Sequence, residues 1–264
     1  MTRYLVQDIE TIPESEVAGE WQPTQAEKDA ANGDPFPPLW AHRVITIGML
    51  ELTKDLRPVK HGCSAGGLVA LGKESDGEEK MIRRWNEVVG GNGRDVAQLV
   101  DYNGRGFDVP VLLHRAFRYG IPVEWYFGKL PDNRGQISAF SKTYRDRYGG
   151  SHLDVTELFT GNGAFSRPRL KHLAQLMGLP GKVGVDGSQV YSMWKTGSLA
   201  EIDLYCMQDV FQTAFIFMRY KLLAGELSLH AYLSSAALLY DYIAALEEHR
   251  AFVASIDKKK LLLD

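Results

Sequence analysis

The sequence predicts an α/β protein, in which a mixed β-sheet is flanked by helices and followed by extra C-terminal helices. Two early runs, Tyr4–Ile9 and Arg43–Thr53, are rich in apolar and β-branched residues, which favours strands. Helical and strand-like patterns then alternate along the middle of the chain, and the last third contains the longest helical patterns. This order indicates one sheet covered by helices.

The composition is that of an ordinary globular domain. The chain has 264 residues, of which 45% are hydrophobic, enough for one large core. Its formal net charge is −3, so it lacks the strong positive excess of proteins that coat polyanions. A nucleic-acid substrate would therefore have to be held by local contacts.

The cysteines and the N-terminal segment bear on the cellular compartment. Cys63 and Cys206 are too few for a disulfide scaffold and lack metal-finger spacing. No run has the apolar length of a signal peptide or a membrane span, and the seven histidines form no HExxH pattern. We therefore expect a cytoplasmic location.

The first half of the chain contains several further predicted elements. Pro13–Trp40 is rich in proline and charge, so we expect a long irregular connection, which in a compact domain commonly lies over a site. Leu68–Leu71 is a candidate third strand, and Glu78–Val89 has apolar residues at helical spacing. Gln98–Tyr102 is expected to be a buried strand, followed after a glycine-rich break by a helix at Val109–Tyr119.

The second half is predicted to be mainly helical. Leu153–Leu158 fits either a strand or the start of a helix, and Arg169–Met177 fits a short helix. A capping-box pattern at Ser198 begins the longest predicted helix, which Gly225 ends. Ser228–Phe252 is rich in alanine, leucine and tyrosine and is predicted as one more helix.

Three groups of residues carry candidate chemistry, and the first is Asp8 and Glu10 at the end of the first strand. Side chains two apart in a strand project from the same side, so these carboxylates are close with no base between them. Two such charges repel each other unless a cation or a proton intervenes. An isolated pair of this kind is also typical of a solvated strand edge.

The second group surrounds Asp108 in the segment Asn103–Pro110. A strand, a glycine turn and a helix start would bring this carboxylate to the sheet edge at which Asp8 and Glu10 emerge. Phe107 is then an exposed apolar residue of the kind that stacks on a base. The alternative is that Asp108 caps the following helix.

The third group is Tyr205 and Asp209, which share a helix face because they are four residues apart. An aspartate within an apolar helix is unfavourable unless it is paired or binds a cation. A salt bridge to an arginine, or exposure on a polar stripe, is the alternative.

Together these groups provide four carboxylates, which suit phosphodiester hydrolysis. Two cations about 3.5–4 Å apart neutralise the phosphate, activate a water molecule and stabilise the leaving oxygen. Oxygen ligands of this kind favour Mg²⁺ or Mn²⁺ over zinc.

The order and spacing of the three groups resemble the DEDD exonuclease superfamily, in its tyrosine-bearing branch. The sequence is most similar to stand-alone bacterial proteins related to the proofreading domain of family B DNA polymerases. The motif residues that carry the resemblance are Asp8, Glu10, Thr11, Asn103, Phe107, Asp108, Pro110, Tyr205, Asp209 and Thr213. Leu173–Lys182 and Val185–Val190 also resemble that family, and the likeness runs from Tyr4 to Leu222. Leu204 occupies the place of the histidine of the other branch, so the tyrosine takes that role.

This resemblance implies a ribonuclease-H-like fold with a five-stranded mixed sheet. We expect an exonuclease domain over residues 1–225 and, beyond the part that the resemblance covers, a helical extension, residues 226–264, packed on the same domain. Asp154 could lie at the same sheet edge as the acids, or could be a structural cap.

The resemblance also assigns roles to individual residues. Two divalent cations would be held by Asp8, Glu10, Asp108 and Asp209. Tyr205 would orient the attacking water. The terminal nucleotide would be held by Thr11, Ile12, Asn103 and Phe107.

The expected activity is hydrolysis at the 3′ end of single-stranded DNA, with release of nucleoside monophosphates. One alternative is an exoribonuclease, for which recognition would depend on the 2′ hydroxyl. The other is a non-catalytic nucleic-acid-binding protein on the same fold. Matched DNA and RNA oligonucleotides distinguish the first alternative, and metal-dependent shortening of a labelled strand distinguishes the second.

Overall fold

A computed structural model describes residues 3–14, 22–31, 36–63, 65–66, 69–70, 75–91, 96–130, 136–147, 150–160, 164–181 and 189–264. Three segments singled out in the sequence lie partly outside the described residues. These parts are residues 15–21 and 32–35 of the irregular connection, residues 68 and 71 of the candidate third strand, and residues 182 and 185–188 of the segments that resemble the exonuclease family.

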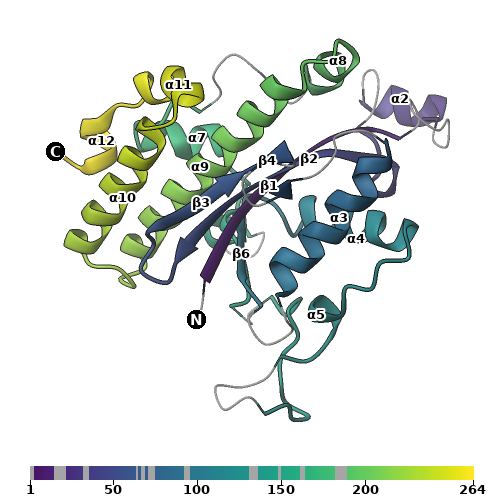
Figure 1. Ribbon diagram of the computed structural model, residues 1–264, viewed down its shortest axis with the longest axis horizontal. Helices are drawn as coiled ribbons and strands as arrows, with labels where there is room; N and C mark the ends of the chain where they lie inside the picture. The colour runs from purple at the N-terminus through teal and green to yellow at the C-terminus, as the bar shows by residue number, and fades with distance from the viewer. Residues whose placement is uncertain are drawn as a thin grey trace.

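A five-stranded mixed sheet forms the centre of the fold (Figure 1), with the strand order β3-β2-β1-β6-β7. Its strands are β1 Arg3–Pro13, β2 His42–Thr53, β3 Pro58–Gly62, β6 Gln98–Asp101 and β7 His152–Asp154. The pairs β1–β2 and β2–β3 are antiparallel, whereas β1–β6 and β6–β7 are parallel. This sheet and its covering helices confirm the predicted α/β fold class and its ribonuclease-H-like architecture.

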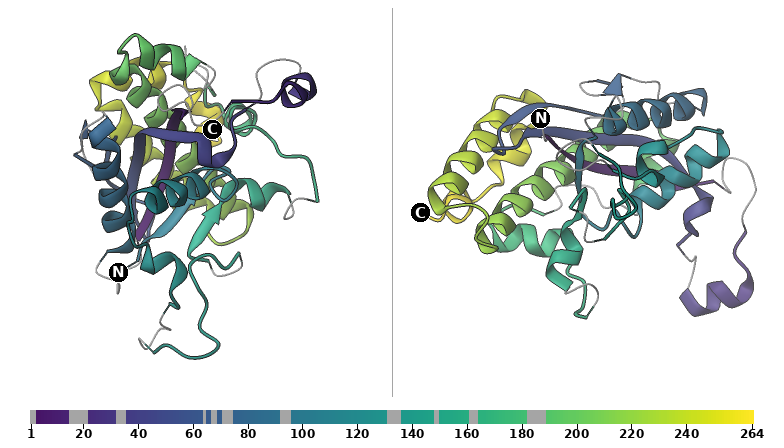
Figure 2. Two further views of the ribbon diagram at one scale, coloured as in Figure 1. Left: turned by 90° about the vertical axis from the view of Figure 1, so that its right-hand side faces the viewer. Right: turned by 90° about the horizontal axis from the view of Figure 1, so that it is seen from below.

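The sheet separates two apolar cores because alternate residues of β1 face opposite ways. Leu5 packs with α3 (Ser75–Gly90) and α4 (Asp108–Arg118). Val6, the next residue, packs with α9 (Leu199–Leu223) on the other face. Helices therefore cover both faces of the sheet (Figures 1 and 2).

The helix α9 has buried residues on all of its sides, as expected of a helix enclosed within a core. Three C-terminal helices pack on it, namely α10 (Leu229–Ala244), α11 (Arg250–Ala254) and α12 (Lys258–Leu262). The buried Tyr232 hydroxyl of α10 donates a hydrogen bond of 2.7 Å to the carbonyl oxygen of Leu261. The C-terminal helices thus share one apolar core with α9 and the sheet.

Shorter elements connect these layers. The short helices are α2 Gln25–Ala31, η1 Leu39–Ala41, α5 Glu124–Phe127, α6 Val155–Thr160, α7 Leu170–Leu176, α8 Val190–Lys195 and η3 Glu247–His249. Within the part of the chain that the structure describes, no helix is long and apolar enough to cross a bilayer.

The prediction of a strand at Leu68–Leu71 is confirmed for its described part, but this strand is not the third one, because β3 precedes it and belongs to the main sheet. The described part of that run, Val69–Ala70, forms β5 and pairs with β4 (Ala65–Gly66) in a separate two-stranded sheet. β3 has the sequence PVKHG and lies at the edge of the main sheet with exposed side chains. An exposed edge strand lacks the apolar pattern that identifies a buried one.

The prediction of one helix over Ser228–Phe252 is also wrong. After α10 the backbone of Leu246 is extended, and the chain makes a 3₁₀ turn before α11. The turn buries the ring of His249 against Phe211 of α9, with ring centroids 5.1 Å apart. Packing against α9 therefore overrides the local helical preference. The undecided segment Leu153–Leu158 contains both the end of β7 and most of α6.

Both ends of α9 lie where the sequence predicts. Ser198 is the N-cap residue, although its side chain makes no capping hydrogen bond, so the predicted capping box is not formed. Gly225 follows the last turn with a φ of 74°, a left-handed conformation that favours glycine.

Close approach of α9 to the sheet occurs at Gly48, which is paired with Asp8 across β1 and β2. A Cβ on Gly48 would lie 2.8 Å from Sγ of Cys206 and 3.2 Å from Cγ2 of Val210. Both side chains belong to α9, so the missing side chain lets the helix lie directly against the strand pair.

We expect Gly48→Ala to lower the free energy of unfolding by about 1–3 kcal/mol, the usual effect of overpacking a core. In a Cys206→Ala background the same substitution should cost clearly less, because the nearest clashing atom is gone. Urea unfolding of wild type, both single variants and the double variant measures this coupling. An equal cost in both backgrounds would contradict the close approach.

Candidate active site

Three carboxylates converge where the end of β1 meets α9. Asp8, Glu10 and Asp209 each place one carboxylate oxygen within 4.8 Å of the others. Asp8 and Glu10 project from the same face of β1 as Val6, which is the face that packs on α9. The register between β1 and β2 shifts directly after Glu10, a bulge of the kind that re-aims side chains near sites. Three of the four predicted acids thus form one set that could hold a metal ion.

Asp108, the fourth predicted acid, lies beside this set. It is the first residue of α4 and is buried. The backbone N–H groups of Asp108 itself and of Ile9 in β1 lower the pKa of its carboxylate, although burial raises that pKa more. Among the neighbouring charges, Asp108 is the one that raises the pKa of Asp8 most. Its carboxylate therefore interacts with β1 and the other acids. The alternative that Asp108 caps α4 is wrong, because Phe107 occupies the N-cap position and Asp108 is the first residue of the helix.

The four acids are electrostatically unfavourable without a cation. Burial raises the pKa of Asp8 well above its usual range, and the charges of Asp108, Glu10 and Asp209 raise it further. Burial, and then the charge of Asp101, raises the pKa of Asp108 in the same way. Oδ2 of Asp8 is buried and receives no hydrogen bond from any described residue. A hard divalent cation such as Mg²⁺ or Mn²⁺ would satisfy this oxygen and offset the repulsion, so the residues fit such an ion.

Tyr205 lies one turn before Asp209 on α9, and their side chains are hydrogen-bonded. Burial, followed by the charges of Asp209, Glu10 and Asp8, holds the pKa of the Tyr205 phenol far above its usual value. The phenol therefore stays protonated at neutral pH. It can position a ligand by hydrogen bonding.

The turn after β6 is held in place by two buried acids. Asp154 accepts hydrogen bonds from the backbone N–H groups of Asn103 and Arg105, at 2.9 and 3.1 Å. Asp101 accepts one from the N–H of Gly104 at 3.2 Å, and a Cβ on Gly104 would lie 2.0 Å from its Cγ. Asp154 thus supports the turn, in agreement with the structural alternative for this residue.

Two of the predicted nucleotide-binding residues meet at His42. Thr11 Oγ1 lies 2.9 Å from Nδ1 of His42. The ring of Phe107 packs edge-on against the imidazole, with centroids 5.0 Å apart. The two residues come from different motifs, so His42 connects the end of β1 with the turn before α4.

The other two predicted nucleotide-binding residues differ in exposure. Asn103 lines the cleft next to the acids, and its side-chain oxygen accepts a hydrogen bond from Arg167. Ile12 is fully buried in an apolar cluster that includes Tyr205. Its side chain presents no surface to a nucleotide and instead supports the tyrosine.

The acids open into a cleft of about 560 Å³. It is lined by Asp8, Phe36, Tyr102, Asn103, Arg169, Leu170, Lys171, Gly181, Tyr205 and Asp209. Three of these residues were not predicted from the sequence: Phe36, Arg169 and Lys171. The alternating basic residues of the segment RPRLK, residues 167–171, were a usable signal for the cations. Neither Arg169 nor Lys171 has a side-chain hydrogen bond or ion pair with a described residue, so both are available to a ligand.

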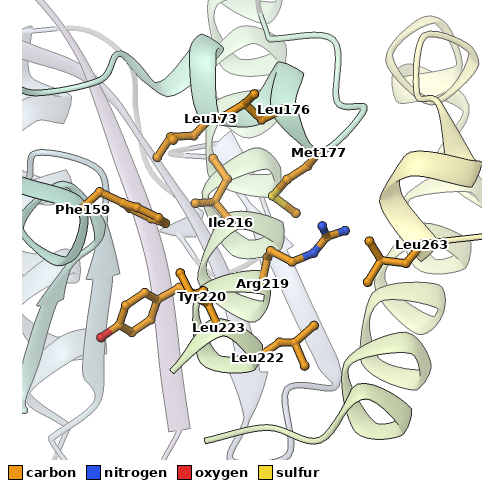
Figure 3. Close-up of a pocket in the computed structure, with 10 residues that line it drawn as sticks. All are labelled: Phe159, Leu173, Leu176, Met177, Ile216, Arg219, Tyr220, Leu222, Leu223 and Leu263. Atoms are coloured by element: carbon orange, nitrogen blue, oxygen red, sulfur yellow. The ribbon is translucent and has the colours of Figure 1, made fainter. Parts of the chain in front are cut away.

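A separate hollow of about 410 Å³ lies between α6, α7, α9 and the C-terminal end (Figure 3). It is lined by Phe159, Leu173, Leu176, Met177, Ile216, Arg219, Tyr220, Leu222, Leu223 and Leu263. Its one charged lining residue, Arg219, donates hydrogen bonds to the backbone carbonyls of Lys260 and Leu261. Because no lining residue is an acid, a histidine or a nucleophile, the acid cleft is the better candidate for chemistry.

Comparison with known proteins agrees with this choice. A family model described as a predicted 3′–5′ exonuclease related to the exonuclease domain of PolB matches residues 34–258. The match covers the second and third motifs and begins after β1, which carries the first. It continues through most of the C-terminal helices, beyond Leu222, where the resemblance noted in the sequence ended. No curated protein matches the chain.

The raised pKa of Asp8 predicts how stability depends on pH in the presence of a chelator. The folded protein holds the proton of Asp8 more tightly than the unfolded chain does. Protonation of Asp8 therefore contributes to the free energy of unfolding. This stabilising contribution is fully present below the usual pKa of an aspartate and is lost as pH rises through the higher folded-state pKa. Asp8→Asn should remove part of this dependence and raise the melting temperature at neutral pH by roughly 2–4 °C, the shift that about 1 kcal/mol produces in a chain of this size.

Differential scanning calorimetry over a pH series, with and without Mn²⁺, measures the pH dependence of stability and the change in melting temperature of Asp8→Asn. Mn²⁺ should stabilise the wild type and leave Asp8→Asn almost unchanged. Asp241→Asn, at a side chain 71% exposed, is the matched control. If Asp8→Asn lowered stability in chelator, the acids would not be mutually repelling.

Proposed function

Because the chain belongs to the family of predicted 3′–5′ exonucleases related to the exonuclease domain of PolB, we propose that it removes nucleotides from the 3′ end of single-stranded DNA. The products would be nucleoside monophosphates. The observation that carries this proposal is the convergence of Asp8, Glu10 and Asp209, with Asp108 beside them and Tyr205 hydrogen-bonded to Asp209.

The four acids would hold two divalent cations, Mg²⁺ or Mn²⁺. The buried and unpartnered oxygen of Asp8 supports this assignment, as does the all-oxygen donor set. When bound, such cations neutralise charge on the phosphate and lower the pKa of a water molecule. Without them, the acids would repel a phosphodiester.

The side chains around the acids would orient the substrate. Tyr205 is neutral, so its hydroxyl can hold the attacking water by hydrogen bonding while Asp209 fixes the hydroxyl. Asn103 offers a hydrogen bond at the cleft, and Thr11 and Phe107, which are joined through His42, would hold the terminal nucleotide with it. Arg169 and Lys171 would contact the phosphates, which supplies locally the positive charge that the chain lacks overall.

The C-terminal helices would serve the same domain as the catalytic residues. Their burial of α9 supports the assignment of residues 226–264 as an extension packed on the exonuclease domain of residues 1–225. The continuation of the family match to residue 258 supports it as well. In this view the extension holds in place the helix that carries Asp209.

Loss of the acids should abolish turnover, whereas loss of the phenol should only reduce it. We expect Asp8→Ala and Asp209→Ala to have no measurable rate, and Tyr205→Phe to be slower by roughly 10²–10⁴-fold, the usual effect of losing a positioned acid–base group. The assay is shortening of a 5′-labelled strand in Mg²⁺ or Mn²⁺, with matched DNA and RNA strands and a chelator control. Full activity of Asp209→Ala would remove α9 from the site, and faster cleavage of RNA would favour an exoribonuclease.

Lys171→Ala should weaken binding of the single strand and reduce its salt dependence. One lost phosphate contact lowers the slope of log K against log salt by about 0.7 for a single strand. Fluorescence anisotropy across a salt series measures the slope, and Lys80→Ala, at an exposed position on α3, is the control. An unchanged slope would show that Lys171 does not contact phosphate.

A further inference from the structure

We propose that Phe36 is a specificity-determining residue that stacks on the base of the 3′-terminal nucleotide, an inference that rests on the proposed exonuclease function. Phe36 lies in none of the three motifs, yet it lines the same cleft as Asp8, Tyr205 and Asp209. Its side chain is 73% exposed, so one face of a large ring is available to a ligand beside the acids.

Exposure alone would not support this role. Phe140 is 96% exposed and makes no ring contact with a described residue, and exposed apolar residues of this kind are common. Phe36 differs because its ring lies 4.9 Å from the ring of His42 and 5.7 Å from that of Phe107, measured between centroids. It therefore belongs to a three-ring platform, Phe36, His42 and Phe107, of which Phe36 lines the acid cleft.

The platform is fixed to the catalytic frame through His42. Its Nδ1 lies 2.9 Å from Thr11 Oγ1, and its Nε2 lies 3.0 Å from the carbonyl oxygen of Pro37, next to Phe36. Burial lowers the pKa of His42, so the imidazole is uncharged at neutral pH and packs as a neutral ring. Rings that are already ordered lose little freedom when a base stacks on them.

The chemistry of the cleft gives the nucleotide one favoured orientation. The unpaired cations Arg169 and Lys171 attract phosphates, whereas the face of Phe36 attracts a base. Every base has a π-face, so this contact would not select sequence. It would require an unstacked terminal base, which favours frayed or single-stranded ends over paired ones.

The test compares Phe36→Ala with wild type on two DNA strands that differ only in the 3′-terminal nucleotide. One strand ends in a normal nucleotide and the other ends in an abasic one. We expect Phe36→Ala to lower kcat/KM on the normal strand by about 5- to 100-fold, the range of base–aromatic stacking, and to leave the abasic strand nearly unchanged. Phe36→Trp should keep the preference for a base, and Phe140→Ala should match wild type on both strands.

Two results would overturn the proposal. Equal losses on both strands would mean that Phe36 only supports the fold of the cleft, and no loss on either would mean that it does not touch the substrate. If wild type cleaved neither strand, the proposed exonuclease function would fail separately. Fluorescence anisotropy of the same strands in Ca²⁺ would then still test the stacking contact, because binding requires no turnover. If wild type binds the normal strand more tightly than the abasic one and Phe36→Ala removes this preference, the contact is supported. Equal binding of the two strands by wild type, or no binding, overturns it.

Discussion

The site depends on one constraint, which is that carboxylates from a strand and a helix must be held together against their repulsion. Two like charges about 4 Å apart repel by roughly 4 kcal/mol at the effective dielectric near a protein surface. The carboxylate oxygens of Asp8 and Asp209 lie within 4.8 Å of each other, so the fold must offset a repulsion energy of this order when both are charged. Gly48 makes the geometry possible because it lets α9 lie directly against β1 and β2.

Apolar burial supplies the opposing stability. β1 is the middle strand of the sheet and packs on both faces, so its acids belong to an element that cannot shift alone. α9 is enclosed by the sheet on one side and by the C-terminal helices on another. The helix that carries Tyr205 and Asp209 is consequently held by apolar packing away from the charged groups. Because of this packing, the carboxylates can stay close together despite their mutual repulsion. Stability is traded for function at this position, as in many active sites.

The sequence predicted the elements and acids whose signals are local. A spacing of two placed Asp8 and Glu10 on one strand face, and a spacing of four placed Tyr205 above Asp209, because both follow from backbone geometry alone. It missed β3, whose exposed edge position leaves no apolar pattern, and it joined α10 to α11 because the burial of His249 against Phe211 is a long-range effect. The cleft residues that lie outside the motifs were missed for the same reason. Their proximity to the acids is a property of the fold and not of neighbouring sequence.

His42 connects the aromatic platform to the segments that carry the acids. It follows η1 at the start of β2, contacts Thr11, the residue after Glu10, and packs on Phe107, the residue before Asp108. A displacement of the aromatic platform would therefore pull on both segments that carry the acids. The rings are thus linked to both of these segments, so on the proposed function a base stacked on the platform would have a defined position relative to the acids. On the proposed function, that position would bring the terminal phosphodiester to the acids whatever base the nucleotide carries.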